Sequence, residues 1–148
     1  MKYLIKIRSF FKVSSKERLL FFEALLFIAI ARIAIRFFSF KKLLNYLGTP
    51  QTELPVEMLT EADKLYLQKI GKAIRRASRV AFWKTLCYEQ AITGKLMLRR
   101  RKIGTTIYIG MMKSEEKGLE GHAWIRAGNY IVTGNIALEQ YTIVGSFS

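Results

Sequence analysis

The sequence predicts an α+β domain in which helices come first and an antiparallel β-sheet follows. Two observations predict this order. Apolar residues recur at helical spacing as far as about residue 101, and after Gly104 apolar and polar residues alternate as they do in strands. Hydrophobic residues make up 51% of the 148 residues, so the chain can bury a core, and this composition argues against disorder.

The first predicted element is a helix over residues 15–47, with Ser14 or Ser15 as its N-terminal cap. Glu17 stands three residues after Ser14, which is the spacing of a capping box. Gly48 and Pro50 end the helix, because glycine and proline interrupt helical structure.

We expect two parts on either side of a linker that is bracketed by Pro50 and Pro55. Residues 1–50 form a basic N-terminal segment followed by the long apolar helix. Residues 51–148 form the domain that holds the remaining helices and the sheet.

The long helix is strongly apolar over residues 19–40, yet its longest charge-free run, Ala24–Ala31, is far shorter than the ~20 residues of a membrane span. Arg18, Arg32 and Arg36 form a narrow basic stripe on it, because eighteen residues correspond to about five helical turns. Three interpretations remain open. The helix packs on the domain while its arginines reach to water, lies on an anionic membrane, or spans the membrane.

The second part begins with a helix capped by Thr60, and another helix runs from Cys87 to about Arg101. In the Thr60 helix, residues at helical spacing form the predicted core face: Ala62, Leu65, Ile70, Ala73 and Ala77. Period-two segments bounded by glycine and polar residues predict four strands, at residues 105–111, 121–127, 130–134 and 141–147.

The charge of the chain indicates anionic partners. Its 25 basic and 11 acidic residues give a net charge of +14, which attracts nucleic acid, anionic lipid and acidic peptides alike. A basic face on the Thr60 helix, at residues 72–79, is either a solvated surface or a docking surface for an acidic partner.

The chain has one cysteine and one histidine, which limits its chemistry. A single cysteine forms no intramolecular disulfide and no cysteine-rich zinc module, and a single histidine adds no metal cluster. We therefore expect no metal and no other cofactor, and a reducing, cytoplasmic location.

Cys87 and His122 are the candidate nucleophile and base. A cysteine in the first turn of a helix has a lowered thiol pKa, because free backbone N–H groups and the helix dipole favour the thiolate. His122 follows thirty-five residues later, at the start of a strand. This order, helix cysteine first and strand histidine second, is that of papain-like sites.

The hairpin signal Gly128-Asn129 predicts the residue that orients the histidine. A two-residue turn there places Ile125 opposite Val132 and His122 opposite Asn135, and opposed residues share a face of the sheet. Asn135 would then accept the imidazole N–H, as asparagine does in Cys-His-Asn sites. Thr133 is the diagonal alternative, and a longer turn would place Thr133 or Gly134 opposite His122. If the Asn135 side chain lies far from His122, a Cys-His dyad remains.

Structural roles are the competing interpretation of Cys87 and His122. A lone cysteine in a reduced protein is usually a small buried hydrophobic residue, and a histidine beside tryptophan is often a satisfied core group. The joint placement of the two residues, with an orienting residue available, favours chemistry over the structural roles.

Several motifs, in this order and at these spacings, resemble the protease half of the lasso-peptide B protein family, whose members are transglutaminase-like and papain-like cysteine peptidases. The residues that carry the resemblance are Cys87–Ala91, Met97–Gly104, Ile107–Gly110, Gly121–Trp124, Ile131–Gly134 and Tyr141–Val144. The resemblance implies that residues 51–148 form a transglutaminase-like domain in which Cys87 and His122 are nucleophile and base. The family's third residue is typically aspartate, and Asn135 stands in the corresponding region here.

The resemblance also implies a function and partners. Such enzymes remove the leader from a ribosomally made lasso-peptide precursor and free an amine for a separate cyclase. The implied partners are the precursor leader, a separate leader-recognition protein and the cyclase, with an anionic surface at the inner face of the membrane as a further candidate and no nucleic acid. Two alternatives stay open: a transglutaminase-like acyl transferase, and a non-catalytic basic module that binds membrane or nucleic acid.

Overall fold

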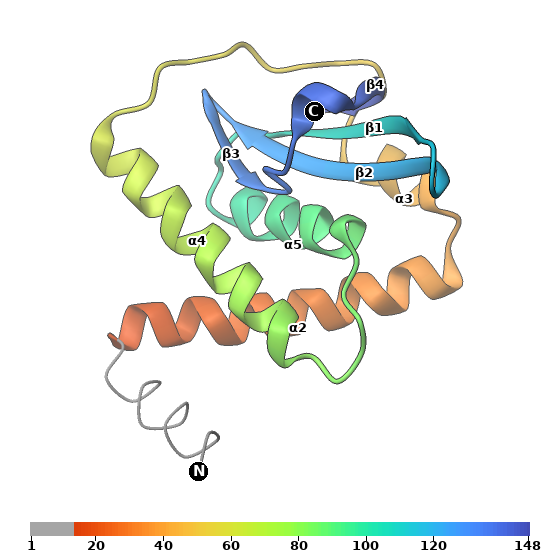
Figure 1. Cartoon of the computed structure of the whole chain (residues 1–148). Helices are drawn as coiled ribbons and strands as arrows, with labels where there is room; N and C mark the ends of the chain where they lie inside the picture. Colours follow the sequence, from red (N-terminus) through yellow and green to blue (C-terminus); the bar gives the residue numbers. More distant parts are fainter. Residues whose placement is uncertain (1–13) are drawn as a thin grey trace.

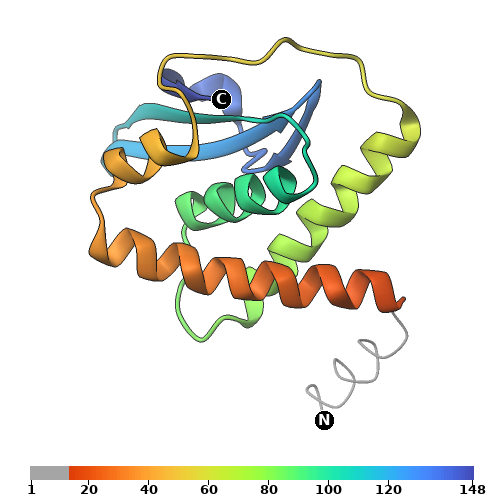
Figure 2. The same cartoon turned by 180° about the vertical axis from the view of Figure 1, so that it is seen from behind.

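The computed structural model of the chain describes residues 14–148. The helices come first: α2 (Ser15–Phe37), α3 (Phe40–Leu47), α4 (Glu61–Val80) and α5 (Cys87–Arg100). The strands follow: β1 (Thr106–Ser114), β2 (Gly118–Ala127), β3 (Tyr130–Thr133) and β4 (Thr142–Phe147), with the short 3-10 helix η1 (Leu138–Gln140) before β4. The predicted α+β order is confirmed. The helix α5 lies beneath the sheet and α2 crosses below it (Figures 1 and 2).

The sheet is antiparallel throughout, in the order β3-β2-β1-β4. Strands β1 and β2 form a long hairpin in which Tyr108 is opposite Trp124 and Ile107 is opposite Ile125. Because neighbouring residues of a strand point to opposite faces, Ile107 and Ile125 enter the core against the helices, whereas Tyr108 and Trp124 stack on the other face. His122 belongs to the same face as Trp124.

Two glycines allow the helices to approach the sheet closely. A Cβ added at Gly94 of α5 would lie 3.1 Å from the side chain of Ile125. A Cβ added at Gly71 of α4 would lie 2.5 Å from the carbonyl oxygen of Val132 in β3. The edge strand β3 is therefore packed directly against the backbone of α4.

The long N-terminal helix packs on the domain through one face. Its residues Leu20, Ala24 and Ile28 are buried in the same core as the residues of α4 and α5. Within the described residues, no helix has the length and hydropathy needed to cross a membrane. The division of the chain at residue 50 stays a prediction.

The predicted helix over residues 15–47 is in fact two helices, and the single-helix prediction was wrong. Phe38 is extended, with φ −116° and ψ 148°, and Ser39 caps α3 by accepting the N–H of Lys42 at 3.4 Å. The break turns α3 so that Leu44 and Leu47 are buried. A serine cap inside an apolar run is a weak signal, and the apolar pattern concealed it.

The predicted caps at Ser14 and Thr60 are confirmed, since their side chains accept N–H groups three residues later, at 3.3 and 3.2 Å. The core face of α4 was predicted only in part. Ile70, Ala73 and Ala77 are buried, but Ala62 and Leu65 are exposed. Leu67, in the same turn as Leu65, is only 2% exposed, so Leu65 lies on the outward face of α4.

Candidate active site

Cys87 is the first residue of α5, and an ion pair between a buried carboxylate and a half-exposed guanidinium holds this helix start. The carboxylate of Glu89 is fully buried and accepts the backbone N–H of Leu86 at 3.0 Å and the guanidinium of Arg32 at 2.9 Å. A carboxylate in the first helical turn also interacts favourably with the helix dipole. The start of α5 is thereby tied to the middle of α2.

Burial raises the pKa of the Cys87 thiol above its ordinary value. Hydrogen bonds from the backbone of Ala123, Tyr88 and Cys87 itself lower this pKa, but they do not outweigh burial, and the negative charge of Glu89 raises it further. The prediction of a lowered thiol pKa was therefore wrong, because it considered the helix start and not the desolvation of the sulfur. At neutral pH the resting side chain is a thiol.

His122 lies on β2 and is 8% exposed. Its Nε2 lies 2.7 Å from the carbonyl oxygen of Gly134. A carbonyl only accepts hydrogen bonds, so Nε2 carries the proton and Nδ1 holds a free lone pair. The rings of Trp124 and Tyr141 pack on the imidazole at centroid distances of 5.9 and 5.1 Å. The histidine is thus fixed in the tautomer that a general base at Nδ1 requires.

The strand register differs from the prediction, and β3 ends before the residue that this register would place opposite His122. Ile125 is opposite Thr133 and not Val132, because a bulge shifts the pairing between Ile125 and Arg126. Gly134 follows with φ +79°, and a Cβ there would lie 2.5 Å from the carbonyl oxygen of Ala123. Only glycine combines this backbone conformation with so close an approach.

The other two candidates for the orienting residue lie elsewhere. The Asn135 side chain is exposed, and within the described residues it makes no hydrogen bond to His122. Thr133 is 2% exposed and shares a face of the sheet with Ile125, the face opposite to His122. The acceptor that meets the imidazole is a backbone carbonyl, and a catalytic role of Asn135 stays a prediction.

Cys87 and His122 approach the same part of β2 from its two faces. The Cys87 thiol interacts with the backbone of Ala123, the residue next to His122. Strand β3 ends at Thr133, so it does not cover β2 at this point. No direct hydrogen bond joins Sγ to the imidazole within the described residues.

Two tyrosines and a phenylalanine lie near these two residues. Burial raises the pKa of Tyr88, and the charges of Cys87 and Tyr141 raise it further, so the three groups are neighbours. Phe40 at the start of α3 packs edge-to-face on Tyr88, with ring centroids 4.6 Å apart. The break before α3 therefore brings an aromatic ring to the candidate site.

Sequence reasoning missed the site roles of Glu89 and Tyr141, and it gave Gly134 only as an alternative. Glu89 had a usable signal, because glutamate at the third residue of a helix commonly caps its start. Gly134 was expected opposite His122 only for a longer turn, and its local signal is weaker, since a glycine directly after a strand often has positive φ. Tyr141 had none, because its contact with His122 depends on the path of η1.

A helix-start cysteine beside a strand histidine of fixed tautomer is the arrangement used in thiol-dependent acyl transfer. The sequence matches the transglutaminase-like superfamily over residues 27–146, and the chain belongs to that superfamily, which includes cysteine peptidases and acyltransferases. No curated protein and no solved structure matches the chain.

Proposed function

We propose that the protein is a cysteine peptidase that removes the leader from a lasso-peptide precursor. The observation that supports it most is the contact of His122 Nε2 with the Gly134 carbonyl at 2.7 Å. This contact leaves Nδ1 as the acceptor for a proton, next to a strand residue whose backbone interacts with the Cys87 thiol. The choice of precursor comes from the motif resemblance around Cys87, His122 and Gly134.

The proposed reaction begins with transfer of the Cys87 thiol proton to Nδ1 of His122. The thiolate attacks the carbonyl carbon of the scissile peptide bond, and the imidazolium then gives its proton to the departing amine of the core peptide. This leaves the leader as a thioester on Cys87. Water, deprotonated by His122, attacks the thioester and releases the leader acid and the free thiol.

Proton transfer at the moment of attack suits the raised thiol pKa. A thiol that is neutral at rest needs a base, and His122 is the only histidine in the chain. The backbone N–H of Cys87, at the start of α5, is the proposed donor to the oxyanion of the tetrahedral intermediate. The positive end of the helix dipole favours the same charge.

The proposed partners follow from the same resemblance. A separate recognition protein binds the leader and presents the precursor, and a separate cyclase uses the amine that cleavage frees. The proposed location is the cytoplasm, where precursor synthesis takes place.

The test combines the purified chain with the precursor peptide and the recognition protein, and mass spectrometry of the products. The expected result is one cut between leader and core. Cys87→Ala is expected to abolish the cut and leave the far-UV circular dichroism unchanged, since Cys87 is only half-buried at a helix end. Full cleavage by purified Cys87→Ala would contradict the peptidase proposal.

A primary amine added to the same assay separates hydrolysis from acyl transfer. If the leader product carries the amine in place of a free acid, the protein is an acyl transferase that shares the thioester step. If the leader acid, the amine-bearing leader and the thioester all fail to form with the full set of partners, the interpretation as a non-catalytic binding module is favoured.

A further inference from the structure

The outward face of α2 carries large apolar side chains in contact with water. Five of them, Leu19, Leu26, Ile30, Ile33 and Phe37, repeat at helical spacing and form what we call the outer stripe. Their exposed fractions run from 42% at Ile30 to 78% at Phe37. The opposite face, with Ala24 and Ile28, is fully buried. The helix is therefore apolar on both sides, and only one side is accounted for by the core.

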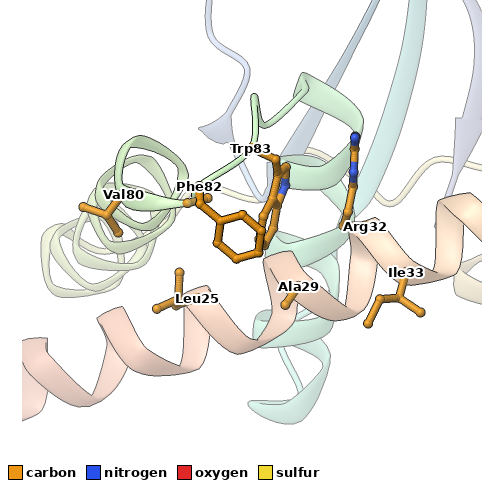
Figure 3. Close-up of a pocket in the computed structure, with 8 residues that line it drawn as sticks. Leu25, Ala29, Arg32, Ile33, Val80, Phe82 and Trp83 are labelled. Atoms are coloured by element: carbon orange, nitrogen blue, oxygen red, sulfur yellow. The ribbon is translucent and has the colours of Figure 1, made fainter.

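The loop between α4 and α5 extends this apolar face. Phe82 is 96% exposed and Val80 is 60% exposed. Together with Trp83 they stand beside α2 and border a groove of about 510 Å³, whose floor includes Leu25, Ala29 and Ile33 (Figure 3). The aromatic rings of the loop and the outer stripe thus lie on the same side of the molecule.

A second groove continues the face past the end of α2. It has a volume of about 400 Å³ and lies between α2 and α3, where Phe38 and Tyr46 are exposed at 60% and 78%. Lys42 lines it as well. Apolar surface therefore follows α2 into α3, with a cation at its edge.

Positive charge borders this face, and its acidic neighbours are already bound. Arg36 and Lys84 are exposed, and Arg32 is half-exposed at the rim of the groove. Glu23 of α2 is held by Arg100, the last residue of α5, and by Arg101, which follows it, at 3.0 and 2.6 Å, and its side chain is only 12% exposed. The remaining described acid of α2, Glu17, lies in the first turn. The rim of the apolar face thus has a positive charge excess.

We propose that this face binds the surface of an anionic lipid bilayer, with α2 lying parallel to the membrane. Phe37 and Phe82 enter the boundary between headgroups and acyl chains, and Arg36 and Lys84 lie at the level of the phosphates. A second copy of the chain fits less well, because a two-fold contact would place like charges opposite one another at a net charge of +14 per copy.

Vesicle flotation with the full chain tests this directly, and it does not depend on any peptidase activity. Wild-type protein is expected to float with vesicles of phosphatidylglycerol and phosphatidylcholine, and to stay behind with phosphatidylcholine alone. Added salt is expected to reduce the bound fraction, because it screens the attraction.

Two double variants test the apolar residues and the basic residues of the proposed membrane-binding face separately. Phe37→Ser with Phe82→Ser is expected to weaken binding on the order of tenfold, and Arg36→Glu with Lys84→Glu by at least as much. All four residues are exposed, so circular dichroism is expected to stay unchanged. Arg32 is left intact, because it also binds Glu89.

Matched controls lie elsewhere on the surface. Leu119→Ser removes an apolar side chain that is 69% exposed on β2, and Lys72→Glu with Arg75→Glu makes the same change in net charge on α4. Both controls are expected to bind like wild type. If the α4 control weakens binding as much as Arg36→Glu with Lys84→Glu does, net charge alone attracts the protein and the proposed face is wrong.

Two further outcomes would overturn the proposal. One is wild-type protein that fails to float with anionic vesicles at low salt. The other is a wild-type dimer in solution that Phe37→Ser with Phe82→Ser converts to monomers, since the face would then join two copies of the chain.

Discussion

Cys87 and His122 lie on neighbouring elements, but the interactions that hold them differ in kind. The cysteine end of the site depends on a charged pair, Arg32 with the fully buried Glu89, which joins two helices. The histidine end depends on an uncharged hydrogen bond to the Gly134 carbonyl and on two aromatic rings. The cysteine end is therefore sensitive to charge, whereas the histidine end is sensitive to the shape of the backbone.

The largest effect is expected from a change of backbone shape at the histidine end. Gly134→Ala places a Cβ 2.5 Å from the carbonyl oxygen of Ala123 in a residue with φ +79°, so Gly134 and its carbonyl must move. Because orientation of the base is critical, we expect a loss in kcat on the order of a hundredfold.

Gly118 is the matched control for this change. It has φ +74°, but no atom lies within 4 Å of an added Cβ. Gly118→Ala therefore introduces only the strain of a left-handed backbone, about 1–2 kcal/mol, and is expected to keep its kcat. If both variants lose activity equally, strain and not the carbonyl position is responsible.

At the cysteine end, the largest effect is expected on stability. Arg32→Ala leaves the buried Glu89 carboxylate without its guanidinium, which we expect to cost about 2 kcal/mol, less than for a fully buried pair because Arg32 is half-exposed. Urea denaturation measures this loss. Lys64→Ala, which removes the cation of the exposed Lys64–Glu61 pair, is the control and is expected to cost less than about 1 kcal/mol. Equal losses in the two variants would show that the Arg32–Glu89 pair has no special weight.

A smaller effect is expected on the pH dependence of the thiol. Because burial raises the pKa of Cys87, its alkylation by iodoacetamide should increase with pH to a midpoint above that of an ordinary thiol. Glu89→Gln keeps the size of the side chain and removes its negative charge, which is one cause of the raised pKa. The midpoint is expected to move to lower pH in this variant, and a midpoint that moves up would contradict the assigned sign.

The smallest effect is expected at Asn135. Its side chain is exposed and is not bonded to His122, so Asn135→Ala should leave kcat unchanged in the cleavage assay. A lower kcat with unchanged precursor binding would instead support the predicted role of Asn135 in orienting the imidazole.

The sequence was sufficient for the fold class and for the elements that hold Cys87 and His122, because helical periodicity, caps and strand alternation are local signals. It was insufficient for the partner of His122. The turn Gly128-Asn129 correctly paired Ala127 with Tyr130, but the bulge next to Ile125 depends on contacts across the sheet. The bulge moves the position opposite His122 from Asn135 to residue 136, and because β3 ends at Thr133, the Gly134 carbonyl makes the contact instead.

The prediction of a lowered pKa for the Cys87 thiol failed for a related reason. The position of Cys87 at a helix start can be recognised locally, whereas its burial depends on Tyr88, β2 and α3 packing around it. Two effects of opposite sign act on one sulfur, and only the weaker of them is visible in the local sequence. The negative charge of Glu89 raises the thiol pKa in the same direction as burial, which is the stronger effect.

The carbonyl of Gly134 has a consequence for how this site would be found by mutagenesis. A scan that replaces side chains removes Cys87 and His122 but never removes a backbone oxygen, so its results would describe a two-residue site. Glycine at position 134 would register only as a position that tolerates no substitution, a result usually assigned to folding. A carbonyl also has no titratable proton, so the third group would be equally invisible in a pH–rate profile. Replacing the peptide bond after Gly134 by an ester, which weakens the carbonyl as an acceptor, is the substitution that would reveal it.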